Sequence, residues 1–161
     1  MGKAKFMKKL FSVIFLLALI SAPVLAAKYA SIGAEVANIR SGAGSKYAVK
    51  WKAWKYTPVA MLAVSKDKQW VQVKDFAGHT GWIFYTSLSK TAGVSAKSDL
   101  NVRKTAAASG EIACTVGKGY AFKFLSKSNG WLNVSDSPAK QGDPVCVGWV
   151  YAANVWAPAA S

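Results

Sequence analysis

The sequence is short of the side chains on which most enzyme and metal sites depend. Its 161 residues include one histidine, two cysteines and only seven aspartates and glutamates. Nucleophilic catalysis needs a serine or cysteine beside a positioned base, but His79 follows Gly78 in a predicted turn, where a solvated side chain is typical. Paired carboxylates must face each other across a cleft, whereas the aspartates fall in turns or at strand ends. With no metal triad and no phosphate loop, we predict no enzyme and no cofactor.

Helical periodicity is also missing after the first 26 residues. Short apolar runs at a spacing of about ten residues, separated by turn residues, occur instead. In residues 48–55, Val49, Trp51 and Ala53 alternate with Lys50 and Lys52, which predicts a half-buried strand. Further strands are predicted at Val36–Arg40, Val59–Val64, Trp70–Lys74 and Gly81–Phe84. The pattern is typical of a small all-β barrel.

Residues 1–26 are predicted to be a signal peptide. Four lysines precede the apolar run Leu10–Ile20, and Val24-Leu25-Ala26 provides the small residues that a signal peptidase reads. As a helix, the run would rise only about 16 Å, too little for a hydrocarbon core of about 30 Å. We expect cleavage after Ala26 and export to the periplasm or the cell wall, with membrane contact only through the signal. An uncleaved anchor is the alternative.

The mature chain is strongly basic. Removing the four signal lysines leaves 21 − 4 = 17 basic residues against 7 acidic ones. Residues 27–94 carry a balance of 10 − 3 = +7 and residues 95–161 a balance of 7 − 4 = +3. Such a field favours anionic envelope polymers, lipid headgroups or acidic partners. Nucleic acid would fit the charge, but export argues against it.

One stretch, residues 37–88, recurs over residues 100–155. Corresponding segments are Asn38-Ile39-Arg40 with Asn101-Val102-Arg103, Trp70 with Trp131, and Gly81-Trp82 with Gly148-Trp149. Loops have changed length while strand signatures were kept, as expected of a duplicated fold. We predict one barrel over residues 27–92 and a second over residues 93–161. The join Ser89–Val94 is too short for a flexible linker, so the copies are expected to lie against each other.

Both cysteines, Cys114 and Cys146, fall in the second copy. Export to an oxidising compartment predicts a disulfide between them. A zinc site is the alternative, but two cysteines with no histidine in the same copy form a poor ligand set. The disulfide would pin the far end of the loop Ser135–Val145, which is the main divergence between the copies. Ser128-Asn129-Gly130 predicts a tight hairpin in the same copy.

The first copy resembles the bacterial SH3-like (SH3b) family. The residues that carry the resemblance are Asn38, Arg40, Ser41, Gly42, Gly44, Trp70, Gly81 and Trp82. The tandem arrangement after a signal resembles exported bacterial SH3 proteins, over residues 28–156. The resemblance implies a barrel of five or six strands and non-catalytic attachment to cell-wall peptides or protein partners. In the second copy, Lys104–Ala108 has lost both loop glycines of the family pattern. Ser87 stands where proline-binding SH3 domains have a tyrosine, so polyproline recognition is not expected.

Tryptophan is the best candidate for binding chemistry, since the mature chain has seven. Trp51, Trp82 and Trp149 are predicted to be core residues, whereas Trp54 and Trp70 lie opposite the apolar stripe, so at least one should be exposed. Flat exposed rings stack on sugars or peptide planes. We hypothesise an aromatic shelf made of Tyr47, Trp54, Tyr56, Trp70 and Tyr85, rimmed by Lys50, Lys52 and Lys55. Alternatively, these rings cover the barrel ends or the contact between copies.

The sequence therefore predicts two tandem SH3-like barrels after a cleaved signal peptide. The function that fits best is a non-catalytic binding module of the cell envelope, which recognises a peptide, peptidoglycan or an anionic wall polymer. The alternative is a structural protein whose aromatic face docks onto another envelope protein. A third possibility is adhesion to acidic membrane surfaces.

Overall fold

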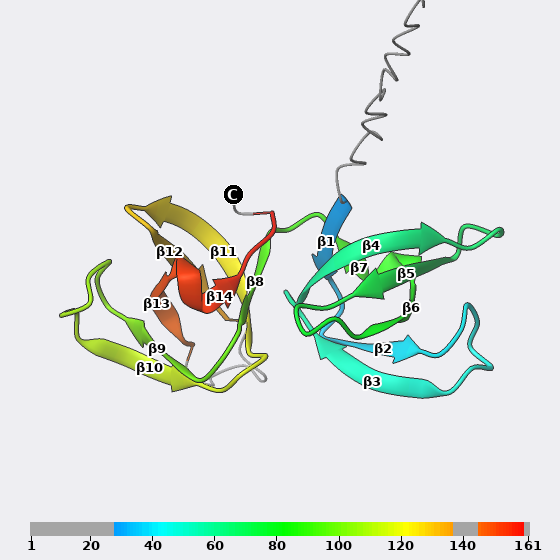
Figure 1. The fold of residues 1–161 in the computed structure, drawn as a ribbon, viewed down its shortest axis with the longest axis horizontal. Helices are drawn as coiled ribbons and strands as arrows, with labels where there is room; N and C mark the ends of the chain where they lie inside the picture. The colour runs from blue at the N-terminus through cyan, green and yellow to red at the C-terminus, as the bar shows by residue number, and fades with distance from the viewer. Residues whose placement is uncertain (1–27, 137–144, 160–161) are drawn as a thin grey trace, which may run out of the picture.

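A computed structural model describes residues 28–136 and 145–159, so the predicted signal peptide lies outside the described residues. The described chain is almost entirely β-structure and forms two antiparallel seven-stranded sheets (Figure 1). The first sheet has the order β3-β2-β6-β5-β4-β1-β7. Its elements are β1 (Lys28–Ile32), β2 (Val36–Arg40), β3 (Val49–Trp54), β4 (Pro58–Val64), β5 (Trp70–Lys74), β6 (Thr80–Phe84), the short 3-10 helix η1 (Tyr85–Ser87) and β7 (Leu88–Ser89).

The second sheet repeats this plan strand for strand, with the order β10-β9-β13-β12-β11-β8-β14. Its elements are β8 (Gly93–Ala96), β9 (Leu100–Arg103), β10 (Ile112–Val116), β11 (Ala121–Ser128), β12 (Trp131–Ser135), β13 (Val147–Tyr151), the short 3-10 helix η2 (Ala152–Asn154) and β14 (Val155–Trp156). The predicted all-β class and the tandem duplication are confirmed. The predicted division between residues 92 and 93 falls between β7 and β8 and stays a prediction.

Alternating side chains explain why these segments form strands. On β5, Val71 and Val73 are fully buried, whereas Trp70 and Gln72 on the other face are only half-buried. Burying one face of each strand of a curled sheet gives one enclosed core. The first core contains Ile32, Ile39, Val71, Val73 and Ile83, and the second contains Val94, Val102, Phe122, Val134 and Val150.

The strand count differs from the five or six that the resemblance implied. β1 is added between β4 and β7 and pairs with both. Its sequence gave little signal, because Ala30 and Ser31 are small and only Ile32 contributes a large core side chain. In the described residues, no pairing joins the edge strands β3 and β7, so the hydrogen bonding of this coiled sheet stays open there.

The disulfide between Cys114 and Cys146 is present, with Cα atoms 6.0 Å apart, which rules out the zinc alternative. It ties β10 to the residue before β13. Beside it, Cys146 N–H donates to Asp136 Oδ1 at 2.9 Å and Asp136 N–H donates to the Cys146 carbonyl at 3.1 Å. Residues 137–144 lie outside the described residues, but both described ends of that loop are held together. The predicted hairpin is confirmed as well, with positive φ angles of 45° at Asn129 and 80° at Gly130.

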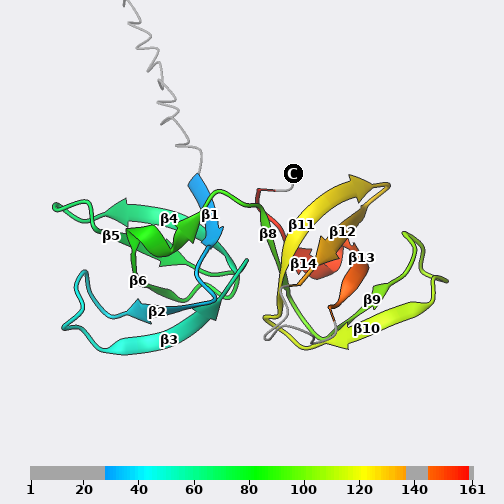
Figure 2. The same ribbon diagram turned by 180° about the vertical axis from the view of Figure 1, so that it is seen from behind.

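The two sheets lie against each other, as the short join predicted. Figures 1 and 2 place β8 next to the first sheet from both sides. A Cβ atom on Gly93 would lie 2.0 Å from the Tyr56 carbonyl oxygen, so the two backbones touch. Tyr29 and Trp156 add an edge-to-face ring contact with centroids 6.1 Å apart. Both described helices are three-residue turns, and no helix in the described ranges has the length and apolarity to cross a membrane.

Candidate binding face

Three aromatic rings lie on the outer face of β5 and β6. Trp70 pairs with Phe84 in the sheet register, and their ring centroids are 5.4 Å apart with planes inclined by 62°. Trp82, two residues before Phe84 on β6, pairs with Gln72 on the same face. We call Trp70, Trp82 and Phe84 the first aromatic face. Phe84 is 40% exposed, and Tyr85, which follows it, is 57% exposed.

The prediction that Trp82 and Trp149 are core residues is wrong. Both are half-buried on the outer face, between buried neighbours. The physical reason lies in the glycines that precede them. A Cβ atom on Gly81 would lie 2.5 Å from Ile39 Cγ2, and one on Gly148 would lie 2.4 Å from the Arg103 carbonyl oxygen. The glycine therefore takes the inward position, and the tryptophan faces outward. Trp51 does pack against the core, as predicted.

Trp54 is separated from the first aromatic face. It ends β3 and is 62% exposed, while Trp70 begins β5, and strands β2 and β6 lie between them in the sheet order. Within the described residues, no ring contact joins the two tryptophans. Trp70 thus lies with Phe84, and Trp54 lies apart from both. The single shelf of the sequence hypothesis is divided.

Tyr47 lies in the loop between β2 and β3 and is held there by the motif that begins at Asn38. Arg40 Nη1 donates to the Tyr47 carbonyl at 2.8 Å. A Cβ atom on Gly42 would lie 2.8 Å from the Tyr47 ring, so the glycine makes room for that ring. In the second sheet, Arg103 Nη1 donates to the Gly110 carbonyl at 2.7 Å in the same way. The repeated arginine is thus explained by loop geometry.

Two of the three predicted rim lysines are engaged within the protein. Lys50 Nζ donates to the Thr80 carbonyl at 2.6 Å. Lys55 pairs with Glu35, and this hydrogen bond raises the pKa of the Lys55 ammonium. The same ammonium lies 5.7 Å from the centroid of the Tyr56 ring. Tyr56 has a positive φ of 66°, and its carbonyl abuts Gly93, so it belongs to the contact between the sheets.

Trp54 and Lys52 line a cavity of about 150 Å³ at the junction of the two sheets. The first sheet also contributes Phe76, and the second contributes Ser95 and Gly119. Ser95 is 1% exposed, and its hydroxyl oxygen has no hydrogen-bond partner within the described residues. Trp54 therefore lies at the contact between copies, as the alternative for these rings predicted, while keeping an exposed surface.

The described residues contain no arrangement suited to catalysis by a metal. No group of three or more histidine, cysteine, aspartate or glutamate side chains gathers within them. His79 is exposed, and its Nδ1 lies 3.0 Å from Asp75 Oδ2. Asp75 Oδ1 accepts the backbone N–H groups of Ala77 and His79, each at 2.9 Å. This carboxylate closes the turn between β5 and β6, which agrees with a turn role for the histidine.

Comparison with known families decides the class of the first sheet. The family model described as "Bacterial SH3 domain" matches residues 33–90. These residues are a bacterial SH3 domain. The match covers β2 to β7 of the first sheet and includes the first aromatic face. The second sheet shares the strand order of this SH3 domain, so the chain has two tandem SH3-like units.

Two solved structures that match the chain come from Trichomonas vaginalis. NlpC1 matches with a TM-score of 0.36 and 13% identity, over 84% of this chain and 47% of that one. NlpC2 matches with a TM-score of 0.34 and 12% identity, over 81% of this chain and 48% of that one. The chain thus spans about half the length of either structure. Among curated proteins there is no match to the chain.

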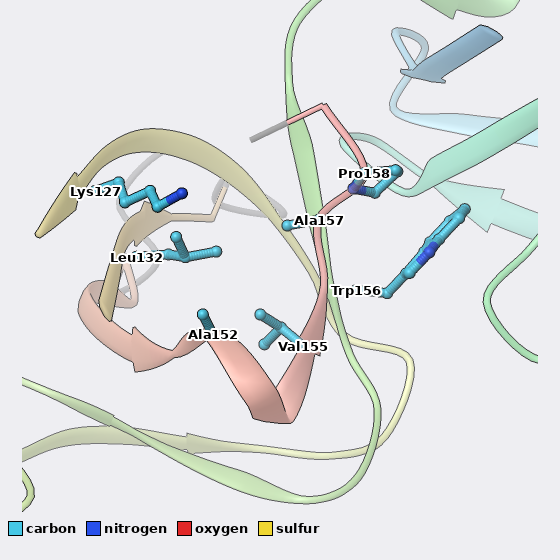
Figure 3. A pocket seen from close by; sticks show the side chains of 7 residues that line it. All are labelled: Lys127, Leu132, Ala152, Val155, Trp156, Ala157 and Pro158. Atoms are coloured by element: carbon cyan, nitrogen blue, oxygen red, sulfur yellow. The ribbon is translucent and has the colours of Figure 1, made fainter. Parts of the chain in front are cut away.

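A shallow cavity of about 270 Å³, which no sequence pattern predicted, lies on the second SH3-like unit. Figure 3 shows Leu132 and Val155 on its apolar side, with Lys127 at the rim and Trp156 pointing away from that lysine. The remaining lining residues are Ala152, Ala157 and Pro158. Three of the lining residues come from the last turn and strand of the unit, whose short apolar segments carry no periodicity.

Proposed function

We propose that the chain is a non-catalytic, exported binding module of the cell envelope. Its ligand is a cell-wall peptide, peptidoglycan or an anionic wall polymer. The observation that carries this proposal is the first aromatic face: Trp70, Trp82 and Phe84 project from a sheet whose core is already filled on its other face. The bacterial SH3 domain over residues 33–90 supports a binding role.

The chemistry of this face suits sugars and peptide planes. Aromatic rings give a large contact area and lose little side-chain entropy when they bind. Two of the three rings are half-buried, so they are already held in place and need little ordering. The positive balance of the first copy would draw anionic polymers toward the face, an effect that salt screens.

Export is supported by the sequence and by the disulfide. The predicted signal at residues 1–26 directs the chain out of the cytoplasm. The bond between Cys114 and Cys146 is of a kind that persists in oxidising compartments. Outside the cytoplasm, the partners available to a basic binding module are wall polymers and envelope proteins rather than nucleic acid.

Retention on purified, protein-free cell wall tests the proposal. The mature chain, residues 27–161, should be retained at low salt and less at high salt. Trp70→Ala should reduce retention at least tenfold, because the lost ring contact alone is worth about 1.4 kcal/mol. Trp54→Ala is the matched control, because Trp54 lies at the junction cavity. Equal retention of the parent and a folded Trp70→Ala variant would contradict a binding role for the first aromatic face.

A second candidate is docking onto another envelope protein. The observation that favours it is a cluster of exposed apolar side chains on β4, where Leu62 is 47% exposed and Val64 is 55% exposed. Exposed apolar patches often mark protein contacts. This candidate predicts no retention on protein-free wall, and co-purification of the chain with one envelope protein.

A further inference from the structure

We propose that the second SH3-like unit carries an equivalent aromatic face and that the chain binds peptidoglycan at two sites. This inference rests on the proposed function and deepens it. We call Trp131, Trp149 and Tyr151 the second aromatic face. The occupant of both faces is the repeating disaccharide-peptide of peptidoglycan, which presents the same epitope many times along one polymer.

The second face has the geometry of the first. Trp131 pairs with Tyr151 in the sheet register, and their ring centroids are 5.4 Å apart with planes inclined by 58°. Trp149 pairs with Asn133, as Trp82 pairs with Gln72 on the first face. Tyr151 is 48% exposed. Each unit therefore presents two indoles and one further ring at matching positions, whereas the Oδ1 atom of Asn133 is buried.

These recurring rings lie outside the hydrophobic core of the second unit. Arg103 and Gly148 have structural roles, because the arginine holds a loop and the glycine lets two backbones approach. Trp131, Trp149 and Tyr151 belong to neither group, and the second core is formed without them. A ring that recurs in both copies on the outside of a filled core is best explained by contact with a ligand.

An exposed leucine recurs at an equivalent position in each unit. Leu62 lies at a bulge in the pairing of β4 with β5, and Leu125 lies at the same bulge in the pairing of β11 with β12. They are 47% and 46% exposed. Bulges re-aim side chains at functional edges of sheets. The two units thus repeat their outward apolar side chains together with their folds.

A repeating polymer fits this arrangement. The backbones of the two units touch at Gly93 and Tyr56, so one compact molecule carries both faces. Two similar faces on one molecule gain affinity through avidity from a ligand that offers its epitope twice. Both copies are basic, and the free carboxylates of wall peptides complement that charge.

The second face should be the weaker of the two. Ala152 N–H donates to the Gly130 carbonyl as Tyr85 N–H donates to the Gln69 carbonyl, so alanine stands where the first unit has an exposed tyrosine. The second unit also has the smaller positive balance. We therefore expect the first face to dominate binding to small fragments, while both faces are needed for tight binding to intact wall.

Two probes separate these sites in the mature chain. At saturating concentration, soluble disaccharide-peptide fragments from digested peptidoglycan should bind with a stoichiometry of two to the parent and one to either Trp70→Ala or Trp131→Ala. On intact, protein-free peptidoglycan, either substitution should weaken retention about 100-fold, because avidity is lost. Tyr151→Ser serves as a second variant, since its side chain is outside the core, and Ile112→Ala on β10 is the exposed control.

The outcomes are distinct. A parent stoichiometry of one, or full retention of both folded second-face variants while Trp70→Ala loses retention, overturns the second site and leaves the proposed function standing. Absence of binding by the parent to both fragments and intact peptidoglycan overturns the proposed function, and the second site with it.

Discussion

Gly81 decides which way the following tryptophan faces. Its missing side chain lets β6 approach β2, where Ile39 Cγ2 would be 2.5 Å and the Arg40 carbonyl oxygen 3.0 Å from a Cβ atom. Any larger residue would push these strands apart. The alternation that directs Trp82 outward therefore depends on a contact that only glycine allows.

Gly81→Ala should lower the free energy of unfolding by about 1 to 3 kcal/mol, the usual cost of overpacking a well-filled site. Gly117→Ala is the matched control, because the closest neighbour of its Cβ atom would be Asp99 Oδ1 at 3.6 Å, an ordinary contact. Urea denaturation of both variants measures the difference. Equal stability of the two variants would show that β2 and β6 accommodate the methyl group.

Tyr120 makes the second unit less stable at alkaline pH. Burial, followed by the hydrogen bond to Asp136, raises the pKa of the Tyr120 phenol from 10.0 to about 12. The phenol donates to Asp136 Oδ2 at 2.6 Å. Because the folded pKa lies above the unfolded one, the stabilisation is complete below pH 10 and is lost as the pH rises toward 12.

Tyr120→Phe removes this pH dependence. At pH 8 the variant should be less stable than the parent by about 1 kcal/mol, the net value of one hydrogen bond. At about pH 11, between the two pKa values, the difference should be smaller, since the parent has lost part of its advantage. Urea denaturation at both pH values gives the two differences. If the difference in stability were the same at both pH values, the pKa of the Tyr120 phenol would not differ between the folded and unfolded states.

The outward position of Trp82 and Trp149 could not be predicted from the sequence. Strict alternation identifies two faces, but it does not say which one is inside when a glycine competes with a tryptophan. The large apolar side chain of tryptophan favoured an inward position for it. The close approach of β2, which only the three-dimensional structure shows, requires glycine at the inward position instead. Trp51 was placed correctly, because Val49 and Ala53 on the same strand made its face the more apolar one.

At the scale of elements, the disulfide is the strongest local constraint. It closes a loop with a sequence separation of 32 between β10 and β13. On the chain-entropy model, opening such a loop costs about 3 to 4 kcal/mol. The bond also holds the described ends of the divergent loop, next to the Asp136 hydrogen bonds.

Replacing both cysteines, with Cys114→Ser and Cys146→Ser, should destabilise the second unit by about 3 to 4 kcal/mol. The first unit contains neither residue and should unfold as in the parent. Thermal unfolding followed with a reducing agent supplies the control, since reduction should affect the parent and not the double variant. If reduction left the thermal unfolding of the parent unchanged, the disulfide would not stabilise the second unit.

The strand pattern was largely readable from the sequence, because burying one face imposes a period of two. Val36–Arg40 and Trp70–Lys74 begin and end where the alternation indicated. β1 was missed, since a strand of small residues leaves little periodic signal. The grouping of the predicted site residues was missed as well, because strand order in the sheet, and not sequence spacing, separates Trp54 from Trp70.

At the scale of the whole molecule, the contact between the units is built on Gly93. A Cβ atom there would meet the Tyr56 carbonyl oxygen at 2.0 Å and Ser31 Cβ at 3.1 Å. Gly93→Ala should therefore push the units apart and expose the join that contains Lys90. We expect faster cleavage by trypsin after Lys90 than in the parent, with Gly117→Ala as control. An unchanged rate of cleavage would mean that the added methyl group does not expose the join to trypsin.

Outward-facing indoles, rather than core ones, should contact the envelope ligand. Indole N–H signals in a nitrogen–proton correlation spectrum report on each tryptophan separately. On addition of soluble disaccharide-peptide fragments, the signals of Trp70, Trp82, Trp131 and Trp149 should shift, while that of Trp51, packed against the first core, should stay in place. No shift at any of the four, or a shift confined to Trp54 at the junction cavity, would contradict the account.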